Sequence, residues 1–185
     1  MLRSGYDELR RPVSALALGE RGWIQRTNFV VTGILMLACA FGLHLALVAY
    51  GRSFWGPFLI GLYAVGLIGA GIFATDVTGM PSKAPAPQQR DFRGALHDLF
   101  SLVVFASLFV ACFVFPHQFA VSGSWGWRLY SVMTGILFGT GFIVFARGFA
   151  SAGKLAAIAG LLQRLTTAVG WIWLALVAAH LLAFI

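Results

Sequence analysis

The stretch FVVTGILMLACAFGLHLALVAY, residues 29–50, decides the fold class. It contains no Asp, Glu, Lys or Arg, and its length is close to the roughly 20 apolar residues that a helix needs to cross a bilayer. Its apolar residues do not alternate with polar ones, so it is not a transmembrane β-strand. A helix is the remaining way to pair every backbone polar group in lipid. Residues 29–50 therefore predict a transmembrane helix.

Four further apolar runs of similar length follow this stretch, at residues 54–75, 96–115, 127–146 and 165–185. Over all 185 residues, 59% are hydrophobic and 10% are charged, whereas a soluble domain carries about 25% charged residues. Such a chain cannot cover a water-facing surface with polar groups. We predict an all-α polytopic bundle of five transmembrane helices.

The segment that precedes the first run, residues 1–28, is polar and mixed in charge. Within it, Pro12 suits the first turn of a helix and Gly19 suits its C-terminal cap. A helix of about two turns is too short to span a bilayer, so we expect it at the membrane interface. The chain is therefore divided into an interfacial segment, residues 1–28, and a bundle, residues 29–185.

Lys and Arg residues are divided unequally between the two sides that five spans create. Eleven lie on the side of the N-terminus: Arg3, Arg10, Arg11, Arg21, Arg26, Lys83, Arg90, Arg93, Arg147, Lys154 and Arg164. Only Arg52 and Arg128 lie on the other side. The positive-inside rule then predicts an inner-membrane protein with a cytoplasmic N-terminus and a periplasmic or extracellular C-terminus.

The net charge of +7 has the same explanation. The basic residues lie between the apolar runs, where they contact anionic lipid headgroups. No basic stripe interleaved with aromatic residues is present, so the charge does not indicate nucleic-acid binding. Membrane lipids are the expected partners.

Ser131, Gly135 and Gly139 repeat at four-residue spacing and form a ridge of small side chains on the fourth predicted helix. Such ridges let helix backbones approach closely in lipid. Two interpretations follow: the ridge packs against another helix of this bundle, or it joins two copies in a homo-oligomer.

Polar residues cluster where the second predicted helix ends and the third begins. Asp76 ends one helix, where the helix dipole disfavours a carboxylate, so a cationic partner such as His97 or Arg93 is expected. We expect Asp76 and His97 to meet and, with Ser14 or Asp98, to line a site for a lipid headgroup or a proton. The alternative is a set of unrelated interfacial residues, since a carboxylate in the first turn of the third helix, such as Asp98, is favourable on its own.

Three histidines, His44, His117 and His180, lie near the opposite ends of three predicted helices. Three imidazoles at similar depth are enough ligands for zinc, and two are enough for haem. No pair shares a helix face at ligand spacing, so the histidines remain weak metal candidates and we predict no cofactor.

Several motifs together resemble a known family. They comprise Gly5-Tyr6-Asp7, the segment from Pro12 to Gly19, Gly22-Trp23-Ile24-Gln25, Asn28-Phe29, Gly71 to Asp76, Leu96-His97-Asp98, Gly160 to Arg164 and Gly170-Trp171. The chain resembles a bacterial and archaeal family of multi-spanning membrane proteins, domain of unknown function 998. That resemblance implies a helical membrane bundle with no established activity, and it covers nearly the whole chain.

Within that resemblance, Ser14, Asp76, His97 and Asp98 fall on recurring polar positions of the family. Relatives typically carry another apolar span before the segment that matches Gly5 to Trp23, whereas this sequence starts with Met1. The expectation is therefore open between five spans and a longer protein with one more.

Few catalytic groups are visible: the sequence has no nucleophile elbow, P-loop, dinucleotide fingerprint or CxxC pair. This scarcity favours a non-catalytic membrane protein that binds or senses a lipid or a small apolar ligand, or that supports a membrane partner. One alternative is a membrane-embedded lipid-modifying enzyme that uses Asp76, His97 and Asp98 or a histidine-bound metal. Another is a small transporter.

Overall fold

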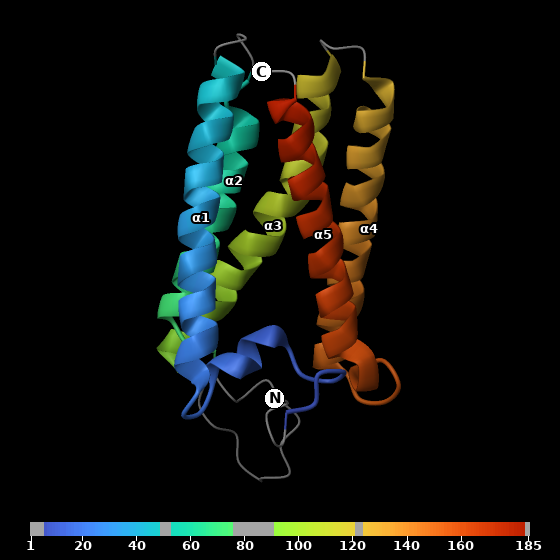
Figure 1. Ribbon diagram of the computed structural model, residues 1–185. Coiled ribbons are helices and arrows are strands. Elements are labelled where there is room, and N and C mark those ends of the chain that lie inside the picture. Colours follow the sequence, from blue (N-terminus) through green and yellow to red (C-terminus); the bar gives the residue numbers. More distant parts are fainter. Residues whose placement is uncertain (1–5, 49–52, 76–90, 121–123, 184–185) are drawn as a thin grey trace.

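The computed structural model describes residues 6–48, 53–75, 91–120 and 124–183. Every regular element in this part of the chain is helical (Figure 1). The five α-helices are α1 (Gly22–Val48), α2 (Trp55–Ile72), α3 (Phe92–Ala120), α4 (Trp125–Ala150) and α5 (Ala159–Leu182). A span long and apolar enough to cross a membrane is found at each of them. The predicted all-α bundle is confirmed, and the chain is a multi-pass integral membrane protein.

The helices run antiparallel to one another in chain order, so the bundle has two ends. At the N-terminal end α1, α3 and α5 begin and α2 and α4 finish; the C-terminal end is opposite (Figure 1). Helix α3 crosses the bundle obliquely, from the side of α1 and α2 at the N-terminal end to the side of α4 and α5 at the C-terminal end (Figure 1). It therefore joins two helix pairs that diverge towards the N-terminal end.

Four helices, α1, α3, α4 and α5, begin earlier than the apolar runs that predicted them. Helix α3 starts at Phe92, and the amide of Ala95 already bonds to the carbonyl of Asp91 at 3.1 Å. Polar residues without proline can extend a helix beyond the apolar run, which hydropathy alone does not reveal. His97 and Asp98 consequently lie in the second turn of α3. The expectation that they occupy its first turn was wrong, and the dipole argument for Asp98 weakens accordingly.

The N-terminal segment, residues 6–21, contains a short 3₁₀ helix, η1 (Val13–Ala17). Pro12 precedes it with φ −65°, and Gly19 follows it with φ 72°, a left-handed conformation that glycine adopts without strain. This turn directs the chain from η1 into α1. A second 3₁₀ helix, η3 (Ala156–Ile158), leads into α5.

Towards the C-terminal end, α3 packs closely against both α4 and α5. The Trp173 side chain is fully buried, lies edge-on to Phe115 at 5.6 Å between ring centroids, and donates from Nε1 to the hydroxyl of Ser131 at 3.0 Å. A Cβ atom on Gly135 would lie 2.7 Å from a ring atom of Phe113.

The small-residue ridge of α4 therefore packs inside the chain. Ser131 meets α5, while Gly135 and Gly139 face α3, where a Cβ atom on Gly139 would lie 2.6 Å from the ring of Phe109. Association of copies through this ridge would need the surface that α3 already covers.

Candidate binding cavity

His97 ties the start of α3 to the end of α2. Its Nδ1 atom lies 3.0 Å from the carbonyl oxygen of Ala70 and 2.9 Å from that of Phe73. Facing two acceptors, Nδ1 carries the proton and donates. The last carbonyls of a helix have no partner within it, and His97, only 2% exposed, supplies one for α2.

Arg26 ties α1 to the same helix end. Its Nε donates to the carbonyl of Gly71 at 3.0 Å, and one terminal nitrogen donates to that of Ile72 at 2.8 Å. A guanidinium also suits the negative end of the helix dipole. Three helices are thus joined at the N-terminal end through main-chain carbonyls.

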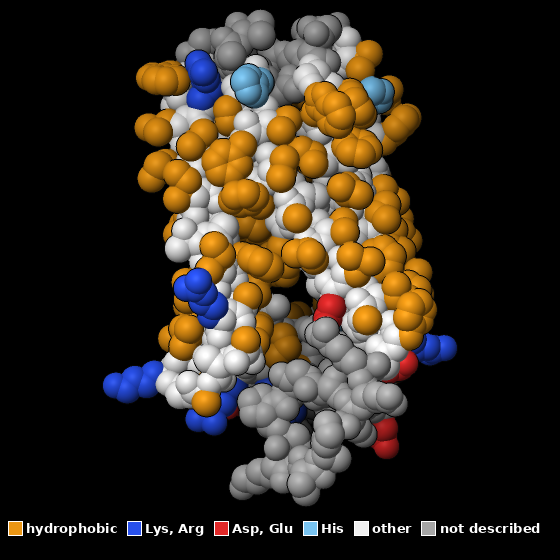
Figure 2. Space-filling model, turned by 180° about the vertical axis from the view of Figure 1, so that it is seen from behind, with side chains coloured by type: hydrophobic (Ala, Val, Ile, Leu, Met, Phe, Trp, Pro, Cys, Tyr) orange, Lys and Arg blue, Asp and Glu red, His pale blue; other side chains and the backbone are white. Residues whose placement is uncertain are grey.

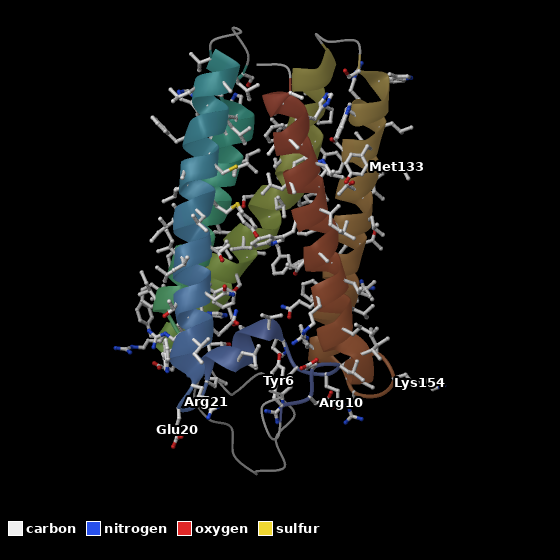
Figure 3. The ribbon with its side chains drawn as sticks, viewed as in Figure 1. Tyr6, Arg10, Glu20, Arg21, Met133 and Lys154 are labelled. Atoms are coloured by element: carbon white, nitrogen blue, oxygen red, sulfur yellow. The ribbon has the colours of Figure 1, made fainter. Side chains whose placement is uncertain are left out.

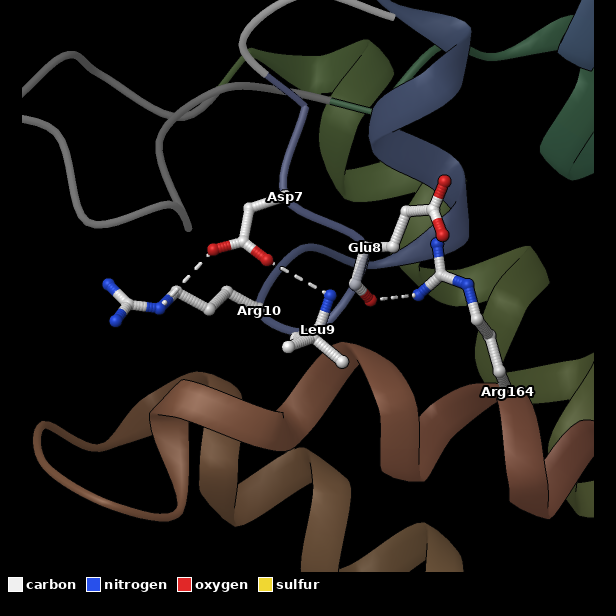
Figure 4. A network of polar contacts seen from close by, with 5 residues as sticks. All are labelled: Asp7, Glu8, Leu9, Arg10 and Arg164. Carbon is white, nitrogen blue, oxygen red and sulfur yellow. Dashed lines mark hydrogen bonds and ion pairs between the residues drawn. The ribbon is translucent and has the colours of Figure 1, made fainter. Parts of the chain in front are cut away.

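Arg164 holds the N-terminal segment against α5. One terminal nitrogen donates to the carbonyls of Glu8 at 2.7 Å, Arg11 at 3.2 Å and Gly160 at 2.8 Å. The other bonds to the hydroxyl of Tyr6. Figure 4 shows the bond to Glu8. One side chain therefore fixes the turn between Glu8 and Arg11, which has no regular structure of its own, to the start of α5.

Two further bonds extend this attachment. The side-chain oxygen of Gln163 accepts from the amide of Val13 at 2.9 Å, and the carbonyl of Leu9 accepts from the amide of Leu161 at 3.0 Å. From there η1 leads on to α1. The N-terminal segment consequently runs beneath the bundle from α5 to α1.

Above this segment lies a cavity of about 1300 Å³, lined by all five α-helices. Its polar lining includes Ser14, Gln25, Asn28, Thr32, Tyr63, Thr75, His97, Asp98, Ser101, Gln163, Thr167 and Trp171. Its apolar lining includes Phe29, Leu67, Leu102, Val104, Phe105, Leu108, Phe138, Phe142, Phe145 and Phe149.

The lining changes in polarity along the helices. On α3, His97 and Ser101 lie close to the N-terminal end, whereas Phe105 and Leu108 lie further along the same helix. At 1.5 Å per residue, His97 and Leu108 are about 16 Å apart along the axis. On α1, Gln25 likewise lies near the helix start. Along α3 the lining is therefore polar near the N-terminal end and apolar further in, whereas on α4 Phe145 and Phe149 line the cavity close to that same end.

The amide of Gln25 is the least satisfied polar group of this lining. Its Nε2 atom is buried and has no hydrogen-bond acceptor among the described residues. A buried donor without a partner costs about 1–3 kcal/mol. By contrast, Trp171 and Tyr63, which link α5 and α2, share a side-chain hydrogen bond in which the indole is the donor.

The cavity reaches the side of the bundle. Seen from behind, the surface is hollowed near the N-terminal end, between hydrophobic side chains (Figure 2). Leu102 lines the cavity and is 52% exposed, so lining residues of α3 also contact the surroundings.

Charged lining residues of the N-terminal segment lie at the outer margin. The guanidinium of Arg10 pairs with Asp7 at 3.3 Å, and their side chains are 67% and 47% exposed (Figure 4). Exposed pairs of this kind contribute about 0–1 kcal/mol. Figure 3 shows Arg10 and Tyr6 beneath the bundle, at the same end as Arg21 and Lys154.

A family model described as "Protein of unknown function (DUF998)" matches residues 1–180. The chain belongs to this family. Comparisons with curated proteins and with solved structures find no match. The resemblance inferred from the sequence is confirmed: this is a DUF998 protein.

The structure brings some of the predicted site residues together. Ser14, His97 and Asp98 all line the cavity. Arg93 is exposed in the first turn of α3 and does not belong to the lining. Asp76 lies outside the described residues, so its contact with His97 remains a prediction.

The three histidines of the C-terminal end occupy separate surroundings. His180 stacks on Trp127 with ring centroids 4.1 Å apart, while His117 is exposed near the end of α3. His44 lies on α1 beside Phe58 of α2 and Phe54, the residue that precedes α2. Across the described residues, no three His, Cys, Asp or Glu side chains are placed to hold a metal ion.

Sequence reasoning missed Gln25, Arg26, Gln163 and Arg164 as a set. The arginines were counted only as topology signals, yet both donate to main-chain carbonyls of another element. One signal was available: the dipeptide Gln-Arg occurs near the start of both α1 and α5. In each case the Gln lines the cavity and the Arg fixes a neighbouring segment.

Proposed function

We propose that this protein binds an amphiphilic lipid in the cavity, with the polar end of the lipid at the N-terminal end of the bundle. The observation that supports the proposal is the change in the lining along α3, from His97 and Ser101 near the N-terminal end to Phe105 and Leu108 further in. An amphiphile matches both parts of such a lining in one orientation.

The cavity volume supports a lipid over a smaller ligand. Pockets for drug-sized molecules hold about 300–1,000 Å³, and this cavity holds about 1300 Å³. A long hydrocarbon chain also fits the extent of the lining along α3.

The divergence of the helices supports a route from the membrane. Helices α3 and α4 pack closely where Gly135 and Gly139 face α3, and they separate towards the N-terminal end (Figure 1). A lipid that moves between them does not have to leave the bilayer. The N-terminal segment covers the cavity from below.

The test is identification of the lipid that co-purifies with the protein, by mass spectrometry of a solvent extract. The cavity variant Thr32→Phe places a ring in the lining, and Thr27→Phe is its matched control, because Thr27 is exposed on the same helix and outside the lining. We expect Thr32→Phe to lose most of the bound lipid and Thr27→Phe to retain it. Equal retention by both variants would contradict the proposal.

The membrane and orientation are part of this proposal: a bacterial inner membrane, with the N-terminal end cytoplasmic. Of the described Lys and Arg residues, only Arg128 lies at the C-terminal end, so the positive-inside rule supports this placement. Cysteine labelling of intact cells should reach Ser53→Cys and miss Lys154→Cys. Labelling of Lys154→Cys without permeabilisation would reverse the orientation.

A further inference from the structure

One ring nitrogen of His97 is not used by the cap of α2. Nδ1 donates to the carbonyls of Ala70 and Phe73, so Nε2 of the neutral imidazole carries a lone pair and acts only as an acceptor. Among the described residues Nε2 has no hydrogen-bond partner, and the one unpartnered side-chain nitrogen or oxygen that is closed off by its surroundings is the amide nitrogen of Gln25. His97 lines the cavity although it is 2% exposed, so Nε2 is open to the cavity.

The charged residues of the lining do not define the ligand. Asp7, Arg10, Arg11 and Asp98 are exposed and include both signs of charge. The outer margin of the cavity therefore accepts polar ends with or without a phosphate. Nε2 of His97 is more selective, because a buried acceptor loses its hydration and gains from a donor that replaces it.

A hydroxyl group matches the surroundings of Nε2. It donates one hydrogen bond and also accepts, so it can bond to Nε2 and at the same time accept from a second donor. Ser101 lies one turn further along α3 and lines the same cavity, so its hydroxyl can be that second donor. An ammonium group has three donors and no acceptor, and it would bring its charge into the bundle.

We propose that the lipid carries a hydroxyl group in its polar end and that this hydroxyl donates to Nε2 of His97. Glycerol and other polyol headgroups belong to this class, whether or not a phosphate links them to the hydrocarbon chain. The inference rests on the proposed function, because it specifies the polar end of the lipid in the same cavity. The imidazole then has two roles: Nδ1 caps α2, and Nε2 selects the ligand.

The experiment is competitive native mass spectrometry of the full chain, delipidated in a zwitterionic detergent. Three probes share one saturated alkyl chain and one phosphodiester, which ends in a glycerol, a propyl or an aminoethyl group. The glycerol and propyl probes have the same charge, and non-specific association favours the propyl probe because it is more hydrophobic. The parent protein should nevertheless retain the glycerol probe about tenfold better than the propyl probe, the equivalent of one well-placed hydrogen bond.

The variant His97→Asn separates the ligand contact from the cap. The amide nitrogen of asparagine reaches about as far as Nδ1 of histidine, so it can still donate to Ala70 and Phe73, whereas no atom of asparagine reaches as far as Nε2. We expect this variant to melt close to the parent and to lose the preference for the glycerol probe. His117→Asn is the matched control and should keep it, because His117 is exposed on the same helix and outside the lining.

Each outcome decides one of the two proposals. Retention of no probe by the parent would overturn both the lipid-binding function and this inference. Equal retention of the glycerol and propyl probes, or a preference for the aminoethyl probe, would overturn the hydroxyl and leave lipid binding intact. A preference for the glycerol probe that is unchanged in His97→Asn would overturn the role of His97. The parent alone tests the hydroxyl, so that result stands even where His97→Asn fails to fold.

Discussion

Helix α3 meets α4 and α5 differently at the two ends of this bundle. Towards the C-terminal end, α3, α4 and α5 meet through side-chain packing, with Trp173 fully buried and Gly135 against Phe113. At the N-terminal end α3 separates from α4 and α5 around a cavity, and Arg26 and Arg164 join the elements through main-chain carbonyls. Closely packed helices leave no space between them. Where the elements lie further apart, the long side chains of Arg26 and Arg164 reach across to the carbonyls that they bond to.

This difference follows from the solvent. In lipid the hydrophobic effect contributes little to helix association, so close packing and hydrogen bonds have to stabilise the bundle. A tightly packed end responds to changes of volume. An end held by hydrogen bonds responds to the loss of individual donors. Substitutions at the two ends separate these two responses.

Loss of the buried indole should be the most damaging change. Trp173→Ala leaves a cavity beside Phe115 and removes the donor to Ser131. A change of this kind costs about 3–5 kcal/mol in a packed core, measured as thermal unfolding in detergent. The control is Trp125→Ala, because Trp125 is 71% exposed, and it should cost under about 0.5 kcal/mol. Similar costs for both would mean that the packed end is not the stable one.

Two glycines of one ridge should respond unequally to overpacking. In Gly135→Leu the new Cβ meets the Cβ of Cys112 at 2.9 Å, an atom that moves only with its backbone. In Gly139→Leu it meets the ring of Phe109, which is 39% exposed and free to turn towards lipid. Overpacking costs about 1–3 kcal/mol, so we expect Gly135→Leu near the top of this range and Gly139→Leu near the bottom. The reverse order of melting temperatures would contradict this reading of the ridge.

The fold was predictable because lipid imposes a strong local condition on sequence. Runs such as residues 29–50 have to be helical wherever they span, and no tertiary information is needed to recognise them. Helix starts were not predictable in the same way: α3 begins at Phe92, before its apolar run, because polar residues extend it.

The cavity was only partly predictable. Ser14, His97 and Asp98 attracted notice as polar residues beside apolar runs, and all three line it. The role of Arg164 could not be recognised from the sequence, because the positive-inside rule already accounts for an arginine at the membrane surface. Its bonds to Glu8 and Arg11 form because the chain returns to the N-terminal segment more than 150 residues later. The composition of the sequence does not indicate that return.

Loss of the buried imidazole should cost less than loss of Trp173. His97→Ala leaves the carbonyls of Ala70 and Phe73 without the donor from α3, and orphaned buried groups cost about 1–3 kcal/mol. His117→Ala is the matched control, because His117 is exposed on the same helix. It should change the melting temperature little. A His97→Ala protein that melts like the parent would show that α2 does not need this cap.

The sequence-based pairing of His97 with Asp76 has its own test. A double-mutant cycle of His97→Gln and Asp76→Asn, read as thermal stability in detergent, measures their coupling. Direct contact should give more than about 0.5 kcal/mol, the level up to which independent sites remain additive. A smaller value would leave His97 as a cap of α2 alone.

The smallest effect on global stability should come from Arg164→Met, although its local effect should be large. The Arg164 bonds to Glu8 and Arg11 lie at the exposed margin, so their loss should lower the free energy of unfolding by under about 1 kcal/mol. The N-terminal segment, however, has few other attachments to α5. Trypsin cleavage after Arg10 requires local opening of that segment, and the cleavage rate follows the free energy of opening when opening is fast.

We therefore expect Arg164→Met to be cleaved after Arg10 several-fold faster than the parent while the melting temperature of the bundle barely changes. Arg147→Met is the control, because Arg147 is an exposed arginine in the last turn of α4. It removes the same charge from the same end of the bundle without touching the segment. Equal cleavage of both variants would mean that general charge attraction holds the N-terminal segment against α5. Faster cleavage only in Arg164→Met would show that hydrogen bonds to individual carbonyls hold it.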